Sequence, residues 1–150
     1  MTSSKPTTII GIDPGKGGGI ASLCNGVMLA EPMPETPQEI YEYLNSMLVP
    51  LAPIRAYLEN VHAMPSDGRA SIWKFARNMG HVEMALIGNG IGYELVTPST
   101  WMKAFLGTVP KVRKDRKRAI KEKAQCLYPN AKITLKTSDA VGIMRYGVSL

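Results

Sequence analysis

Three acidic residues that lie far apart along the chain have the types and surroundings of metal ligands. Asp13 ends a β-branched apolar run and is followed at once by Pro14 and a glycine, so its carboxylate lies where a strand gives way to a turn. Glu59 lies in an apolar segment, where a carboxylate is costly to bury unless it is paired or binds a cation. Asp139 opens an otherwise apolar helix. If the three converge at one edge of a sheet, their oxygens suit Mg²⁺ or Mn²⁺, with water and a substrate phosphate as further ligands.

Two of these acids also have a simpler interpretation when each is taken alone. Asp13 can be a turn residue that bonds its own backbone, and Asp139 can be an acid placed against a helix dipole. A Walker phosphate loop is not favoured, because only three residues separate Gly11 from the Gly15-Lys16 pair, and glycine follows the lysine. The metal-site hypothesis therefore depends on the three acids together.

Residues 111–123 carry the whole positive excess of the chain. This segment holds eight basic and two acidic side chains, and the 150-residue chain has a net charge of +6 from 18 basic and 12 acidic residues. A concentrated cationic patch on an otherwise neutral chain is typical of phosphate-backbone binding, because each neutralised phosphate releases counterions. The simpler interpretation is a solvated helix face. Nucleic acid is the expected partner.

Length and composition favour one domain over residues 1–150. A chain of 150 residues that is 45% hydrophobic can bury one core. Residues 1–6 lack the apolar stretch of a signal peptide and no run is long enough to span a membrane, so we expect a cytoplasmic, DNA-associated protein. Cys24 and Cys126 match no metal-ligand spacing and are expected to be buried thiols.

The hydrophobic pattern predicts an α/β order of elements. Turn signals separate three short strands at the start of the chain, which indicates an antiparallel meander. Predicted strands cover residues 7–13, 19–24, 27–31, 55–61 and 92–96, and predicted helices cover 36–48, 70–87, 100–105, 113–128 and 139–146. Ser138 is the expected N-cap of the last helix. Helix 70–87 carries an apolar stripe typical of a core face, but further apolar residues indicate a partner helix, with Trp73, Phe75 and Met79 at a dimer interface.

Five short motifs, in the right order and spacing, resemble a known family. They lie at residues 11–15 (Gly-Ile-Asp-Pro-Gly), 57–65, 73–80, 96–101 and 138–140. The sequence resembles the bacterial, RuvC-like Holliday junction resolvases of the ribonuclease H-like superfamily, and in particular their short bacteriophage forms. The resemblance covers nearly the whole chain. It implies a ribonuclease H-like α/β fold, with a five-stranded mixed sheet whose first three strands are antiparallel and which helices flank, in a homodimer that binds four-way DNA junctions.

The resemblance also implies a mechanism and residues that perform it. In that family two metal ions hydrolyse a phosphodiester, so Asp13 would bridge both ions while Glu59 and Asp139 would each hold one. The family places DNA-contacting lysines in a segment that here holds Lys103 and Lys111 or Lys114. The full set of candidate DNA contacts is Lys16, His62, Lys103, Lys111, Arg113, Lys114, Arg116, Lys117, Arg118 and Lys136. His62 can stack on a base or shuttle a proton, or have no role.

One departure from the family pattern leaves other functions open. Relatives usually carry a fourth carboxylate shortly before the last Asp, and Lys136 stands at that place here. A non-catalytic or weakly catalytic junction-binding protein of the same fold is therefore the alternative to a nuclease. Flaps, forks or RNA–DNA hybrids remain possible substrates of a nuclease. An actin-like or sugar-kinase ATPase also begins with a strand, an Asp and a Gly turn, but its second domain would not fit in 150 residues.

Overall fold

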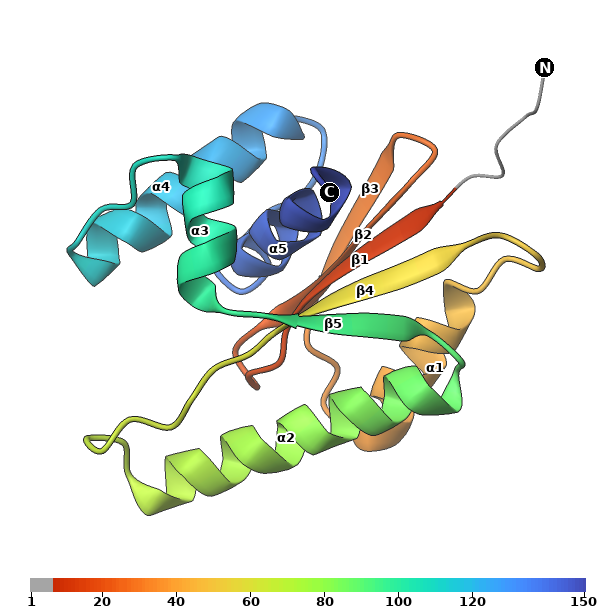
Figure 1. Ribbon diagram of the computed structural model, residues 1–150, viewed down its shortest axis with the longest axis horizontal. Helices are drawn as coiled ribbons and strands as arrows, with labels where there is room; N and C mark the ends of the chain where they lie inside the picture. Colours follow the sequence, from red (N-terminus) through yellow and green to blue (C-terminus); the bar gives the residue numbers. More distant parts are fainter. Residues whose placement is uncertain (1–6) are drawn as a thin grey trace.

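The computed structural model of the chain describes residues 7–150 and shows a five-stranded mixed sheet flanked by five helices (Figure 1). Residues 1–6, for which the sequence predicts no signal peptide, lie outside the described part. The elements follow in the order β1 Thr8–Asp13, β2 Gly19–Cys24, β3 Val27–Pro32, α1 Pro37–Ser46, β4 Ile54–Glu59, α2 Arg69–Gly88, β5 Gly92–Val96, α3 Pro98–Leu106, α4 Arg113–Leu127 and α5 Ser138–Val148.

The sheet has the strand order β3-β2-β1-β4-β5. Strands β1, β2 and β3 are antiparallel, and β4 and β5 add in parallel on the other side of β1. Asn25 and Gly26 join β2 to β3 with φ angles of 51° and 78°, as a two-residue type I′ hairpin turn requires. The predicted mixed sheet, with its antiparallel first three strands, is confirmed.

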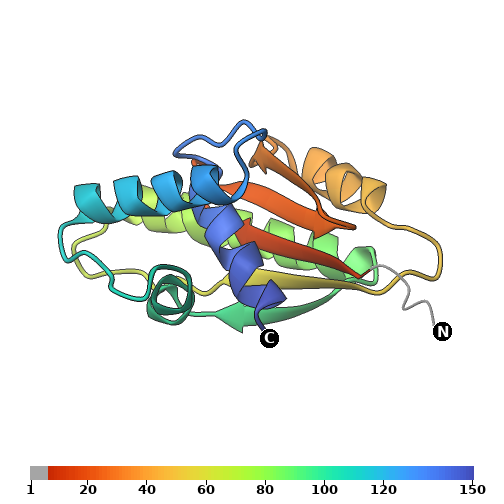
Figure 2. The ribbon, with the colours of Figure 1, turned by 90° about the horizontal axis from the view of Figure 1, so that it is seen from above.

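Helices cover both faces of the sheet. Helices α1 and α2 lie on one face, and α3, α4 and α5 lie on the other, as the view from above shows (Figure 2). Two separate clusters of buried side chains form the core, one under each layer of helices. Helix α5 packs across β1 and β2, so its first turn lies near the end of β1. None of the helices in residues 7–150 combines the length and apolar character needed to cross a membrane.

Local capping explains where two helices begin, and it corrects one prediction. Thr36 Oγ1 accepts a hydrogen bond from the backbone N–H of Glu39, and the Thr36 N–H donates in return to the Glu39 carboxylate. Thr97 caps α3 by accepting from the backbone N–H of Thr100. Ser138 was predicted to cap α5, and this is wrong. It is the first helical residue, Thr137 occupies the N-cap position, and the buried Ser138 hydroxyl has no hydrogen-bond partner among the described residues.

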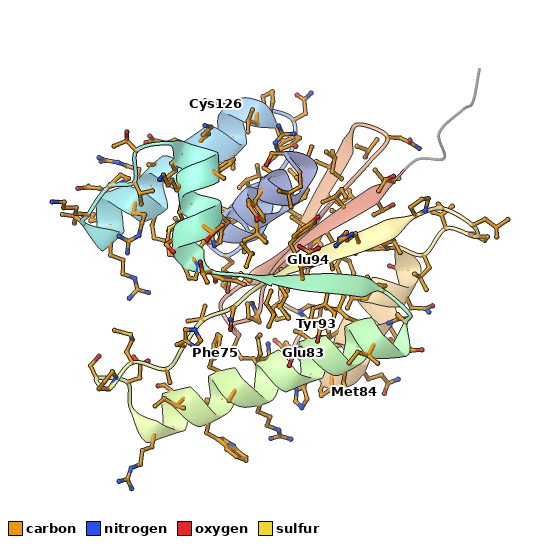
Figure 3. The ribbon with its side chains drawn as sticks, viewed as in Figure 1. Phe75, Glu83, Met84, Tyr93, Glu94 and Cys126 are labelled. Atoms are coloured by element: carbon orange, nitrogen blue, oxygen red, sulfur yellow. The ribbon has the colours of Figure 1, made fainter. Side chains whose placement is uncertain are left out.

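Two further predictions differ from the structure. The fourth strand ends at Glu59 and not at residue 61, because the backbone after it turns away once Asn60 has donated to the Val96 carbonyl. Cys126 is exposed on α4 and Cys24 is half-buried, so neither is the fully buried thiol that the sequence predicts. Figure 3 shows Cys126 on the outer helical layer. Both cysteines are free.

Candidate active site

Asp13 and Glu59 lie side by side because of the register of two parallel strands. Ile12 pairs with Leu58 in the β1–β4 ladder, so the residues that follow them leave the sheet at the same edge. Asp13 is half-buried, and Glu59 is only 7% exposed. The backbone N–H of Gly15 donates to Asp13 Oδ1 at 3.3 Å. The predicted convergence of the first two acids is thus present in the fold.

Gly11 allows α5 to bring Asp139 close to the same edge. A Cβ atom at Gly11 would lie 2.2 Å from the backbone nitrogen of Met144 and 2.3 Å from the carbonyl oxygen of Ala140. Only a residue without a side chain therefore permits this approach of helix to strand. Asp139 is 7% exposed, and its charge is close enough to influence both Asp13 and Glu59.

Trp101 holds the carboxylate of Glu59. The indole Nε1–H donates to Glu59 Oε1 at 2.9 Å, and Trp101 itself is 1% exposed. Its ring lies against Gly142, where a Cβ would come within 2.6 Å of the ring. A single-donor residue such as Trp fixes one oxygen of the carboxylate and leaves the other free for a ligand.

Lys117 reaches from α4 to Asp139. Its ammonium donates to Asp139 Oδ2 at 2.5 Å, whereas the buried Oδ1 of the same carboxylate has no hydrogen-bond partner among residues 7–150. An unpartnered buried carboxylate oxygen is costly, and binding a cation is one way to satisfy it. Asp139 is thus half paired, with one oxygen available to a metal ion.

The pKa values of two of the acids reflect a deficit of positive charge at the site. The pKa of Asp13 is raised to about 6, first by burial and then by the Asp139 carboxylate, while the Gly15 N–H and the Lys117 ammonium oppose the rise. The pKa of Glu59 is raised to about 7, first by burial and then by the Asp13 charge, while the Trp101 hydrogen bond opposes the rise. One ammonium group does not compensate three clustered carboxylates. The surroundings favour either protons or an added cation.

The residues fit a divalent cation in donor type but do not form a closed cage for one ion. No group of three or more His, Cys, Asp or Glu side chains that could hold a metal ion occurs in residues 7–150. Mg²⁺ commonly binds through one or two protein carboxylates and completes its shell with water and substrate phosphate. The buried free oxygen of Asp139 and the raised pKa values of Asp13 and Glu59 agree with such open coordination.

The predicted DNA-contact residues on and around α4 have different surroundings. Lys111, Arg113 and Lys114 are exposed, but Arg116 donates to the carbonyl oxygens of Pro110 and Lys111. Arg118 forms ion pairs within its own helix, with Asp115 at 3.6 Å and Glu122 at 3.9 Å. Lys103 is exposed on α3, and Lys136 is exposed in the turn before α5. The structure thus brings Lys117 to the carboxylates and leaves the start of α4 free to meet a phosphate.

Helix α2 presents its predicted interface residues to two different grooves. Phe75 and Met79, together with His62 from the β4–α2 segment, line a groove of about 550 Å³. Figure 3 shows Phe75 on the side of α2 that faces this segment. Trp73 instead lines a groove of about 240 Å³ that also contains Lys16. The three residues predicted at a dimer interface therefore do not share one face.

The sequence did not indicate three contacts of the site. In the sequence, Lys117 was one of many candidate DNA contacts in a charged run. Trp101 belonged to a motif but was given no function of its own, and Asn78 was one residue of a largely apolar helix. Asn78 is 1% exposed and its amide donates to the Pro14 carbonyl at 2.6 Å, next to Asp13. The one signal that could have identified Asn78 is its place as a polar residue among the apolar positions of a long helix.

Comparisons with known proteins identify the fold. No family model matches the chain, and no curated protein matches it. Twenty-three chains of solved structures do match. One is Thermus thermophilus RuvC in complex with a Holliday junction substrate, with a TM-score of 0.68 and 16% identity over 94% of this chain and 92% of that chain. Another is a Thermus thermophilus RuvC structure, with a TM-score of 0.60 and 17% identity over 94% and 93%. This similarity confirms the predicted ribonuclease H-like, RuvC-type fold.

Proposed function

We propose that this protein is a metal-dependent endonuclease that cleaves branched DNA, with four-way junctions as its main substrate. The observation that carries the proposal is the convergence of Asp13, Glu59 and Asp139 at one sheet edge, with pKa values and an open oxygen that favour a cation. The basic start of α4 and the RuvC-type fold support DNA as the substrate.

The chain's own residues would hold and orient the reacting groups. Mg²⁺ or Mn²⁺, when bound, supplies charge neutralisation and an activated water. The pKa of Glu59 is raised by both Asp13 and Asp139, and that of Asp13 by Asp139, so the three carboxylates interact. Asp13 would contribute to both ions, with Glu59 and Asp139 each holding one, as the resemblance implies. Trp101 fixes Glu59, and Lys117 fixes one oxygen of Asp139 while it places a positive charge beside the incoming phosphate.

A homodimer is part of this proposal. A four-way junction has two-fold pseudosymmetry, so two active sites related by a C₂ axis can cut opposing strands. The groove that Phe75 and Met79 line is the apolar surface on α2 best suited to a second copy, because Ile72 extends it along the helix.

The test is a cleavage assay on labelled junction, flap and duplex DNA in Mg²⁺ and Mn²⁺. Asp13→Asn and Glu59→Gln should each lower the cleavage rate by at least about 100-fold, because each removes an anionic ligand for a hard cation. Binding of the junction without metal should be unchanged or tighter, since a negative charge beside the phosphate is removed.

The matched control is Glu42→Gln, which neutralises an exposed acid on α1, away from the site. This variant should cleave like the wild type. Metal-dependent cleavage that persists in highly purified Asp13→Asn protein would contradict the assigned site.

A junction-binding protein without nuclease activity is the second candidate. Lys117 already occupies one oxygen of Asp139, and Lys136 stands where a further acid would complete the cluster. This candidate predicts tight, metal-independent junction binding with no nicking by the wild-type protein in either metal. Any nicking that Asp13→Asn abolishes excludes it.

A further inference from the structure

A second, smaller groove lies beside the turn that follows Asp13. It has a volume of about 240 Å³ and lies between α2, the β1–β2 turn and the start of α1. Lys16, Lys74, Arg77 and His81 line it from two of these segments, and Trp73 lines it from α2. The groove is separate from α4, so the basic segment identified in the sequence does not contribute to it.

The cations of this groove are available to a ligand. Lys74 and Arg77 are exposed, and neither forms an ion pair within residues 7–150. The Lys16 ammonium donates to the main-chain carbonyl of Glu35, and the Glu35 side chain is the one acid that lines the groove. Three positive charges thus line the groove with one acid, and the Glu39 carboxylate also interacts with Lys16.

Trp73 gives the groove an aromatic surface. It is 68% exposed, so the face of its indole is accessible to a ligand. Tryptophan and arginine are enriched at protein interfaces, but a groove lined by three cations and one acid favours an anionic ligand over a second copy of this chain, whose own net charge is +6. A positive groove with an exposed aromatic ring is typical of single-stranded nucleic-acid binding, in which bases stack on the ring and cations follow the backbone.

Asn78 connects the floor of this groove to the catalytic turn. Its side chain is buried in the groove lining, and its amide donates to the carbonyl oxygen of Pro14 at 2.6 Å. Pro14 follows Asp13 directly, and Lys16 comes two residues later in the same turn. A strand held in the groove therefore lies next to the segment that carries the first catalytic acid.

We propose that this groove binds an unpaired stretch of the DNA strand that enters the active site, with a base stacked on Trp73 and phosphates bound by Lys16, Lys74 and Arg77. The inference rests on the proposed nuclease function and deepens it, because it assigns to this chain a preference for substrates with unpaired nucleotides near the cut. Asn78 is a positioning residue in this arrangement, since it acts on Asp13 through the turn.

The experiment measures binding of fluorescent oligo-dT and of duplex DNA in EDTA, where no cleavage occurs. Trp73→Ala should weaken oligo-dT binding by about 5- to 150-fold, the range that follows from one lost base stack. Its binding to duplex should stay within twofold of the wild type, because paired bases cannot stack on the indole. The double variant Lys74→Gln/Arg77→Gln should lower the salt slope of oligo-dT binding by about 1.4, or 0.7 for each lost phosphate contact.

Tryptophan fluorescence gives an independent readout. The chain has two tryptophans, and Trp101 is buried, so oligo-dT should quench the exposed Trp73. Quenching should disappear in Trp73→Phe, although this variant keeps an aromatic ring and most of the affinity. The charge control is Lys132→Gln/Arg145→Gln, which removes two cations that do not line the groove.

The outcomes separate this inference from the nuclease proposal. An equal loss of oligo-dT and duplex affinity in Trp73→Ala, a salt slope lowered as much by the control pair, or no quenching of Trp73 overturns the groove. If these binding results appear as expected but the wild type cuts no branched DNA in Mg²⁺ or Mn²⁺, the groove stands and the nuclease proposal fails. If the wild type shows metal-dependent cleavage but both groove variants bind oligo-dT like the wild type, the nuclease proposal stands and the groove inference fails.

Discussion

The carboxyl groups of Asp13 and Glu59 lie in surroundings that favour their neutral forms. Burial is the main cause of their raised pKa values, and the neighbouring acids add to it. Holding ionised carboxylates buried and close together costs free energy in the metal-free protein. A bound divalent cation would compensate these charges. The same groups therefore connect metal binding, pH and the free energy of unfolding.

The metal-free protein should lose stability as the pH rises. The pKa of Asp13 is about 6 in the folded protein and near 4 in an unfolded chain, so between these values the folded state binds more protons. The stabilisation is full below about pH 4 and is lost as the pH passes 6, and Glu59 extends the loss to about pH 7. We expect the melting temperature in EDTA to fall from pH 5 to pH 8 and Mg²⁺ to restore part of it at pH 8.

Asp13→Asn isolates the contribution of one acid to this pH dependence. The amide cannot ionise, so at pH 8 in EDTA this variant should be more stable than the wild type, by on the order of 2 kcal/mol. At pH 4 the two proteins should unfold at similar temperatures. Thermal unfolding by circular dichroism measures both, and a variant that is less stable than the wild type at pH 8 would show that Asp13 has a net stabilising role.

Lys136 should limit metal affinity at the site. It is exposed in the turn immediately before α5, where the resemblance leads one to expect an acid. Lys136→Asp should lower the Mn²⁺ concentration needed for half-maximal cleavage, because an added anionic oxygen favours a hard cation. It should also weaken metal-free junction binding, because a positive charge becomes negative. Loss of cleavage with an unchanged metal requirement would instead identify Lys136 as a phosphate contact.

At the scale of elements, strong local signals predicted most of the fold. The Asn25-Gly26 turn and the alternating runs around it specify the hairpin, and Thr36 and Thr97 mark helix starts by side chains that bond the backbone. The three acids were predictable because a carboxylate at a strand end or in an apolar run needs a partner. The Lys117–Asp139 contact was not, since it joins two helices whose relative placement depends on packing across the sheet.

Helix α4 should bind DNA mainly through its first turn and through Lys111, two residues before the helix. Lys111, Arg113 and Lys114 are exposed and outside the ion pairs of the helix, so neutralising all three to Gln should lower the salt slope of junction binding by about 2.7, or 0.9 per contact on duplex arms. Arg118→Gln should change the slope little, because Asp115 and Glu122 already face its guanidinium. Fluorescence anisotropy across a salt series measures both. Equal slopes for the triple variant and the wild type would mean that α4 faces solvent.

At the scale of the whole molecule, α2 separates two kinds of surface. One side carries the apolar groove of about 550 Å³, and another carries the smaller groove with Trp73 and its cations. Helix α2, which lines both grooves, lies on the same face of the sheet as α1, opposite the layer that supplies Lys117 and Asp139 (Figure 1). The candidate site at the sheet edge is thus flanked by α4 on one side and by α2 on the other, and a branched DNA that reaches both sides would cross the carboxylates.

The apolar groove should hold a second copy of the chain, and its loss should uncouple the two cuts of a junction. Met79→Glu places a charge in the groove and should shift the protein to a monomer, measured by sedimentation equilibrium. On a supercoiled plasmid with an extruded cruciform, the wild type should give mainly linear product, and the variant nicked circles or no product, because a monomer has one active site.

The matched control for this substitution is Met84→Glu. Met84 lies on the same helix, is 62% exposed and does not line the groove (Figure 3), so this variant should remain a dimer with paired cuts. If Met84→Glu dissociates the dimer while Met79→Glu does not, the interface lies on another face of α2. If the wild type is a monomer at every concentration and still makes linear product, two independent cuts occur and the dimer is not needed for resolution.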